Sequence, residues 1–89
     1  MRSLLTDDFI DCFNKLPANV KELARKNYKL WKRNPSHPGL NFKPIGKRLP
    51  AFSIRIGIGW RALAVKDNDN ILRFWIGSHA EYDRLIKRI

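Results

Sequence analysis

The chain has 89 residues, of which 18 are Lys or Arg and eight are Asp or Glu, so its formal net charge is +10. Hydrophobic residues make up 44% of the sequence, which is too much for a disordered chain and enough for one compact core. A chain this short leaves little room for a deep pocket. We therefore expect a single domain over residues 1–89 that works through its surface or with a partner.

The number of cysteines and the first residues of the chain indicate the cellular compartment of the protein. The single cysteine, Cys12, cannot form an internal disulfide, whereas a secreted domain of this length normally carries several cysteines. Asp7 and Asp8 interrupt the sequence before an apolar run forms, so we expect no signal peptide, and no stretch reaches membrane-spanning length. We expect a cytoplasmic protein in which Cys12, on the apolar stripe of a helix, is a buried structural thiol rather than a nucleophile.

The positive charge is concentrated in the middle of the chain. Between Glu22 and Asp67 there is no acidic residue, and the same window holds eleven Lys and Arg. Such a window produces a broad positive field that attracts polyanions and speeds their capture. Nucleic acid is therefore the favoured partner. A merely solvated basic surface and a patch that docks an acidic protein are the alternatives.

Two amphipathic helices are predicted first. Thr6 is a good N-cap, and an apolar stripe at helical spacing follows it over residues 9–16. Pro17 ends this helix and suits the first turn of a second one, in which Asn19 and Glu22 have the spacing of a capping box. The second helix should stop before the next proline. Helices joined this closely are expected to form an antiparallel hairpin.

Alternation with a period of two replaces the helical pattern in the second half of the chain. Strands are predicted over residues 40–45, 52–58, 60–66 and 71–76, and the short turn segments among them favour antiparallel pairing. Ser78 and Glu81 then have the spacing of a capping box that opens a short C-terminal helix. The predicted fold class is α+β: an N-terminal helical hairpin packed on a small antiparallel β-sheet, with a short C-terminal helix and the helices against one face.

Segments along nearly the whole chain resemble toxins of the RelE/ParE superfamily. The resemblance is carried by the helical hairpin and by residues 34–35, 52–56, 59–63 and 75–82. Its most specific parts are the pair Trp60-Arg61 and the Gly77-Ser78-His79 ending that follows a strand. The resemblance implies a RelE-like fold and a type II toxin–antitoxin system. In such a system a cognate antitoxin wraps the toxin and neutralises it, and the toxin reaches operator DNA only through the antitoxin complex.

For function, the resemblance leaves three alternatives open. RelE-like and YafQ-like members cut mRNA on the ribosome without a metal and so inhibit translation. The ParE branch instead inhibits DNA gyrase and lacks the RNase residues. A catalytically weak homologue that acts only in an antitoxin complex is the third alternative. We expect the ribosome-dependent endoribonuclease, because residues suited to that chemistry are present.

Metal-free RNA cleavage uses the 2′-hydroxyl of the substrate as nucleophile and needs groups that move protons and stabilise charge. His79 follows a strand and lies in the first turn of a capped helix, where backbone N–H groups attract phosphate. It resembles the catalytic histidine of YafQ-like toxins; an exposed histidine without a role is the alternative. Arg55 projects from the face opposite Ile54 and resembles a basic residue of RelE, with phosphate clamping as its role.

The remaining candidates have two interpretations each. Arg61 shares a strand face with Leu63, so we expect partial burial, either in a structural ion pair or as a functional arginine at the rim of the sheet. Tyr82, in the last helix, either stacks on an RNA base or packs in the core. Trp75 is assigned to the core, and a capping role competes with any role of Glu81 as a base. The predicted site comprises catalytic His79, Arg55, Arg61 and Tyr82, the RNA-backbone contacts or solvated charges Lys43, Lys47 and Arg48, and no metal or cofactor.

Overall fold

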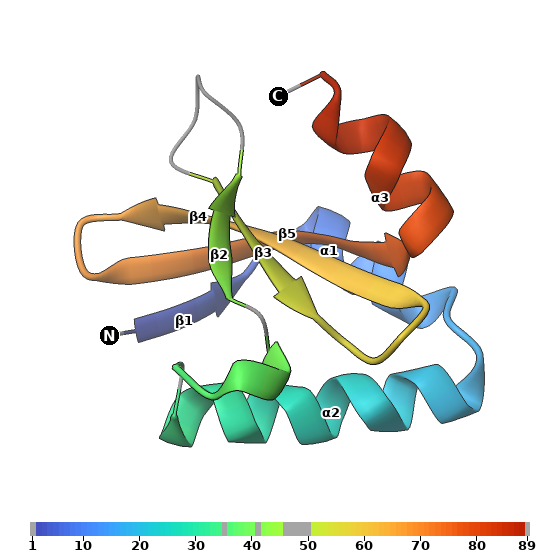
Figure 1. The fold of residues 1–89 in the computed structure, drawn as a ribbon, viewed down its shortest axis with the longest axis horizontal. Coiled ribbons are helices and arrows are strands. Elements are labelled where there is room, and N and C mark those ends of the chain that lie inside the picture. The colour runs from blue at the N-terminus through green and yellow to red at the C-terminus, as the bar shows by residue number, and fades with distance from the viewer. Residues whose placement is uncertain (1, 35, 41, 46–50, 89) are drawn as a thin grey trace.

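A computed structural model describes residues 2–34, 36–40, 42–45 and 51–88. The chain forms two helices, a short 3₁₀ turn, a run of strands and a last helix, and a further strand precedes them all (Figure 1). The elements are β1 (Arg2–Leu5), α1 (Asp7–Asn14), α2 (Ala18–Arg33), η1 (Pro38–Leu40), β2 (Lys43–Ile45), β3 (Ala51–Arg55), β4 (Trp60–Asp67), β5 (Asn70–Ser78) and α3 (His79–Ile86). This order confirms the predicted α+β fold with a helical hairpin before the sheet and a short helix after it.

The helix starts agree with two of the three predicted caps. The Thr6 side chain accepts a hydrogen bond of 3.1 Å from the backbone N–H of Phe9, so it caps α1 as expected. Ser78 and Glu81 form the complete capping box of α3. The capping box predicted at Asn19 is wrong. Helix α2 begins at Ala18, directly after Pro17, so Asn19 is already inside the helix, and no side chain in the described ranges caps this end.

The sheet has five strands in the order β1-β5-β4-β3-β2. The three pairs among β2, β3, β4 and β5 are antiparallel, as the turn segments predicted. Strand β1 was not predicted. It pairs with β5 in parallel, so the sheet is mixed. Its four residues show no alternation, and their partner lies at the far end of the chain, so no local pattern could indicate the pairing. Thr6 secures the junction, because its N–H and its hydroxyl both donate to the carbonyl of Arg73, at 3.0 and 3.2 Å.

Helices α1 and α2 cover one face of the sheet and form the main core with it. Ile54 on β3 and Ile56 just after it lie on this face and are fully buried, as predicted. The predicted strand over residues 52–58 is too long at its end, because β3 stops at Arg55 and Ile58 is 86% exposed. Burial of one such side chain stabilises the fold by about 1.5–3 kcal/mol. Cys12 packs at the edge of the same core and is half-buried. The core consists of Phe9, Leu16, Val20, Ala24, Trp31, Leu40, Ile54, Ile56, Ala62, Ala64, Ile71 and Ile76.

Helix α3 lies on the other face, so the expectation of helices on one face is wrong. Trp75 neighbours the core residue Ile76 on β5 and therefore points away from α1 and α2, and it shares a hollow with residues of α3. Figure 1 shows α2 and α3 on opposite sides of the sheet. The periodicity of a helix indicates which of its own sides is apolar. It does not indicate which face of the sheet that side covers.

Two further differences concern the strands. The predicted strand over residues 40–45 is a 3₁₀ turn, Pro38–Leu40, followed by the three-residue strand Lys43–Ile45. Strand β5 contains a β-bulge, because Leu63 pairs with Trp75 whereas the next residue of β4, Ala64, pairs with Arg73. The bulge shifts the alternation of β5 and turns Arg73 toward the core face. Within the described part of the chain, no helix has the length and apolar character needed to span a membrane.

Candidate functional site

Three of the predicted residues meet at one end of the sheet. Arg55 pairs with Arg61 across β3 and β4, and Arg61 pairs with Gly77 across β4 and β5. Residues directly opposite each other on antiparallel strands project from the same face, so these positions form a row on the α3 face. The backbone N–H of His79 donates to the carbonyl of Gly59 at 2.8 Å, which holds the start of α3 against the β3–β4 turn. The row and His79 are therefore neighbours.

His79 is oriented by a carboxylate. Its Nδ1 lies 3.1 Å from Oδ2 of Asp83, one helical turn further along α3, and the two side chains are 46% and 54% exposed. An ion pair this exposed contributes at most about 1 kcal/mol to stability. Its importance is geometric, since Nδ1 faces the carboxylate and Nε2 is the ring nitrogen directed away from it. Asp83 was missed in the sequence, although the spacing of four residues from His79 is the signal that could have found it.

Among the described residues Arg61 has no ion-pair partner, and its guanidinium is bound by backbone carbonyls instead. Its Nη1 donates to three carbonyls of the β3–β4 turn, those of Gly57 at 2.9 Å, Trp60 at 2.7 Å and Ile58 at 3.4 Å. The same turn contains Gly57 with φ of +106°, a conformation that favours glycine. The side chain is half-buried, as expected. Arg61 therefore shapes the turn against which His79 rests and adds a positive charge there.

Tyr82 and Arg55 differ in their exposure to solvent. Tyr82 is only 6% exposed, and its ring centroid lies 5.8 Å from that of His79 with the planes tilted by 54°. A ring this buried offers no face to an RNA base, which favours the packing interpretation and gives Tyr82 contact with the imidazole. Arg55 is half-buried and points away from Ile54 and Ile56, as the alternation of β3 predicted.

Of the three residues predicted to contact the RNA backbone, one lies within the described part of the chain. Lys43 is exposed on β2, and its pairing with Ser53 puts it on the same face as Arg55. Lys47 and Arg48 lie outside the described residues. His37 is exposed in the loop before β2, where its Nδ1 accepts a hydrogen bond of 3.0 Å from the N–H of Gly39, a local structural role.

A hollow beside this row was not anticipated. It has a volume of about 240 Å³ and is lined by Trp75 of β5, by Glu81, Arg84 and Leu85 of α3, and by Arg88 just after that helix. Trp75 is half-buried rather than in the main core, and its indole lies across Gly77: a Cβ at that position would come within 2.5 Å of Cζ2. An indole and two arginines that line one hollow have the chemistry that stacks a nucleic-acid base beside a phosphate, and the Glu81 carboxylate in the same lining reduces the positive charge there. In the sequence, this hollow could have been indicated by the glycine two residues after Trp75 and by the spacing of four residues between the two arginines.

Comparisons with known structures identify the fold. The fold resembles the toxin YafQ from E. coli, with a TM-score of 0.74 at 11% identity over 92% of this chain and 98% of that one. It also resembles the RelB-RelE antitoxin-toxin complex from Methanococcus jannaschii, with a TM-score of 0.73, 17% identity and coverage of 91% and 96%. For the RelBE2 toxin-antitoxin complex from Mycobacterium tuberculosis the TM-score is 0.71, at 17% identity with 88% and 96% covered. The fold is thus that of RelE-like toxins.

The sequence itself assigns the family. The profile of the ParE-like toxin domain matches residues 18–84, which is most of the chain. The chain belongs to this family, within the RelE/ParE superfamily, and is a toxin of a toxin-antitoxin system. No curated protein sequence matches it significantly.

Proposed function

We propose that this toxin is an endoribonuclease that cuts mRNA on the ribosome without a metal and thereby inhibits translation. The observation that carries the proposal is the pairing of His79 with Asp83 beside the arginine row of Arg55 and Arg61. The net charge of +10 supports an RNA substrate, because the sequence-independent part of RNA affinity comes from phosphate contacts.

The chemistry follows from the imidazole. Neutral His79 accepts the proton of a 2′-hydroxyl, the oxygen attacks the adjacent phosphorus, and the bond from phosphorus to the 5′-oxygen breaks, with a proton from solvent going to the leaving oxygen. The products are a 2′,3′-cyclic phosphate and a 5′-hydroxyl. The Asp83 carboxylate stabilises the imidazolium that forms, and the buried Tyr82 ring fixes the imidazole from the other side. These groups carry both proton transfer and orientation at one end of α3.

Positive side chains on the α3 face bind the phosphate backbone in this proposal. Arg55 suits bidentate binding of the scissile phosphate, because guanidinium geometry matches phosphate and its charge stabilises the transition state. Arg61 adds charge while holding the turn. Lys43 contacts the backbone on the same face, and we extend that role to Lys47 and Arg48. Trp75, between β5 and α3, stacks on a base.

The biological setting is also part of the proposal. The M. jannaschii and M. tuberculosis relatives were crystallised as complexes with antitoxin partners, which supports a cognate antitoxin for this chain. We propose that this antitoxin neutralises the toxin, that operator DNA is bound only through their complex, and that the chain acts as a single domain in the cytoplasm, where ribosomes and message are present.

The runner-up is a gyrase inhibitor without RNase activity, and the match to the ParE-like toxin domain favours it. The carboxylate-imidazole pair would have no role in such a binding protein. Inhibition of gyrase supercoiling by the purified chain, with ribosome-bound message left intact, would reverse the ranking. If neither activity is present and expression of the chain alone does not slow growth, the weak homologue remains.

The deciding experiment is cell-free translation of a reporter with purified chain, followed by primer extension on the message. The parent is expected to produce cuts within the translated region. His79→Gln is expected to reduce cutting by about a hundredfold or more, the usual contribution of a general base. His37→Gln is the matched control, since it removes the other histidine from an exposed loop and should cut like the parent. Equal cutting by His79→Gln would reject the proposed mechanism.

A further inference from the structure

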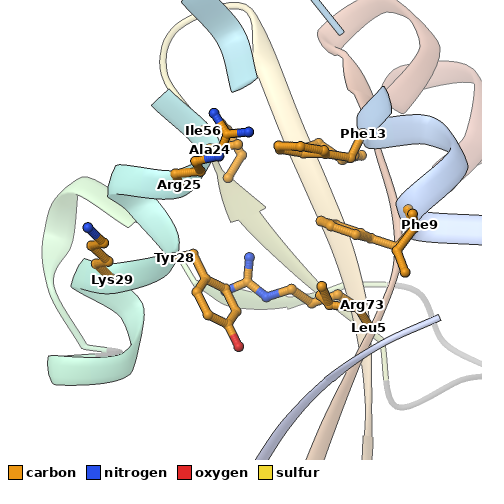
Figure 2. A pocket seen from close by; sticks show the side chains of 11 residues that line it. Leu5, Phe9, Phe13, Ala24, Arg25, Tyr28, Lys29, Ile56 and Arg73 are labelled. Carbon is orange, nitrogen blue, oxygen red and sulfur yellow. The ribbon is translucent and has the colours of Figure 1, made fainter. Parts of the chain in front are cut away.

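A cleft of about 320 Å³ opens between α1 and α2, although a chain of this length was expected to have little room for one. Its walls are mostly apolar, with Phe9 and Phe13 of α1 on one side and Tyr28 of α2 on the other, and Arg25 and Lys29 also line it. Figure 2 shows Phe9 and Phe13 on one side of the opening and Arg25 and Tyr28 on the other. The cleft is on the core face of the sheet, opposite the face that carries the arginine row. It is therefore separate from the His79 cluster, which comprises His79, Tyr82 and Asp83 with Arg55 and Arg61.

The unusual feature of this cleft is Arg73. The β-bulge of β5 turns its side chain under the helices, where it is 1% exposed, and Figure 2 shows its guanidinium beside the ring of Tyr28. The Nε and Nη2 atoms are fully enclosed and have no hydrogen-bond partner among the described residues. No acidic side chain in those ranges pairs with Arg73. A buried guanidinium without a counter-ion is rare, because buried charges are normally paired.

The aromatic rings around Arg73 compensate for only part of what its guanidinium loses on burial. The guanidinium carbon lies 4.7 Å from the Tyr28 centroid and 5.0 Å from the Trp31 centroid, close enough for cation–π attraction. Ring faces stabilise the charge but do not replace oxygen acceptors for N–H groups that lie in the guanidinium plane. Burial lowers the pKa of Arg73 to about 10, so the side chain is charged at neutral pH. Arg73 therefore lines the cleft as a cation with unused donors, and a ligand must displace the neighbouring side chains that cover these donors to reach them.

This arrangement suits a ligand that carries an anionic group on an apolar body. Folding has already removed water from the Arg73 guanidinium, so an incoming carboxylate bears only its own dehydration. The carboxylate then gains charge-assisted hydrogen bonds in the bidentate geometry that guanidinium favours. The apolar walls require that the rest of the ligand be apolar too. A concave volume of this size, with few polar groups, falls in the range of small-molecule sites, about 300–1,000 Å³.

We propose that the cleft between α1 and α2 is a binding site for a small free monocarboxylate, whose carboxylate pairs with Arg73 while its apolar part lies between Phe9, Phe13 and Tyr28. Arg25 and Lys29 add positive charge that attracts the anion. The site is independent of the proposed RNase function, because none of these residues belongs to the His79 cluster, and either assignment can fail without the other.

The test uses 4-phenylbutanoate as ligand and 4-phenylbutan-1-ol as its neutral match, titrated into the full chain and followed by NMR of the aromatic rings and the arginine Nε–H groups. Saturable shifts are expected at Phe9, Phe13, Tyr28 and the Arg73 Nε–H. The acid should bind about tenfold to a hundredfold more tightly than the alcohol, since a hydrogen bond to a charged group contributes that factor.

Three variants make the test specific. Arg73→Met should remove the preference for the acid, and Lys66→Met, which removes an exposed charge on β4, should leave it unchanged. Phe13→Trp, which fills the cleft without touching the charge, should weaken both ligands. Equal binding of acid and alcohol to the parent, or an acid preference that survives Arg73→Met, would overturn the assignment. So would binding of the capped peptide acetyl-Leu-Glu-Phe-amide with no binding of the free acid, because the occupant would then be a segment of a partner protein.

Discussion

Replacement of Arg73 by methionine is expected to stabilise the protein, although it removes one of the most deeply buried side chains of the structure. Burial lowers the pKa of Arg73 to about 10, well below its usual range. At about 1.4 kcal/mol for each pH unit, the charged form opposes folding by about 3 kcal/mol. The variant also loses the contacts with Tyr28 and Trp31, together about 1–2 kcal/mol. The unbranched methionine fills much of the same space, so we expect a net gain of about 1–2 kcal/mol.

The pH dependence of this gain follows from the direction of the shift. The folded state holds the Arg73 proton less tightly than the unfolded state, so the penalty is fully present below about pH 10 and is relieved as the pH rises above about 10. The difference between variant and parent should therefore be constant between about pH 6 and 9. Urea unfolding followed by tryptophan fluorescence measures it, with the slope against urea unchanged.

Lys66→Met is the control for loss of a charge, and it should change the free energy of unfolding by no more than about 0.5 kcal/mol. A loss of stability above about 1 kcal/mol in Arg73→Met would refute the reasoning, because the guanidinium would then have favourable partners. A variant that is more stable but no longer prefers the acid over the alcohol would mark Arg73 as a residue kept for binding rather than for folding.

Further substitutions test other parts of the structure. Asp83→Asn should reduce mRNA cutting about tenfold to a hundredfold, measured by primer extension, while the thermal midpoint changes little, because the pair is exposed. Gly77→Ala should destabilise the protein by about 1–3 kcal/mol and alter the near-ultraviolet circular dichroism, since the added Cβ displaces the Trp75 indole. Thr6→Ala should cost about 1–2 kcal/mol in urea unfolding, because the α1 cap and the hydroxyl bond to the Arg73 carbonyl are both lost. An unchanged stability in either of the last two variants would contradict the packing described.

Local patterns in the sequence were sufficient for much of the fold. The N-cap at Thr6, the capping box of Ser78 and the alternation around Ile54 each depend on residues a few positions apart, and each is found as predicted. Strand β1 depends instead on a partner at the other end of the chain, and its pairing is visible only once the sheet has formed. The face covered by α3 was missed for a similar reason.

The bulge in β5 is the main reason why the position of Arg73 could not be predicted from the sequence. Strict alternation from Ile76 would put Arg73 on the α3 face, among the other arginines, whereas the extra residue puts it in the core. The pairing of His79 with Asp83 was accessible from helical spacing, and Arg61 could be expected to be half-buried but not to bind the turn carbonyls. Contacts to backbone atoms leave no pattern in the side-chain sequence.

The most direct test of the central claim is single-turnover cutting of message on purified, programmed ribosomes, with the ends of the products identified. If His79 accepts the 2′-hydroxyl proton, the parent leaves 2′,3′-cyclic phosphate and 5′-hydroxyl ends, and His79→Gln is slower by about a hundredfold or more. Cutting at the parent's rate by His79→Gln, or an intact message together with inhibited gyrase, would contradict the account.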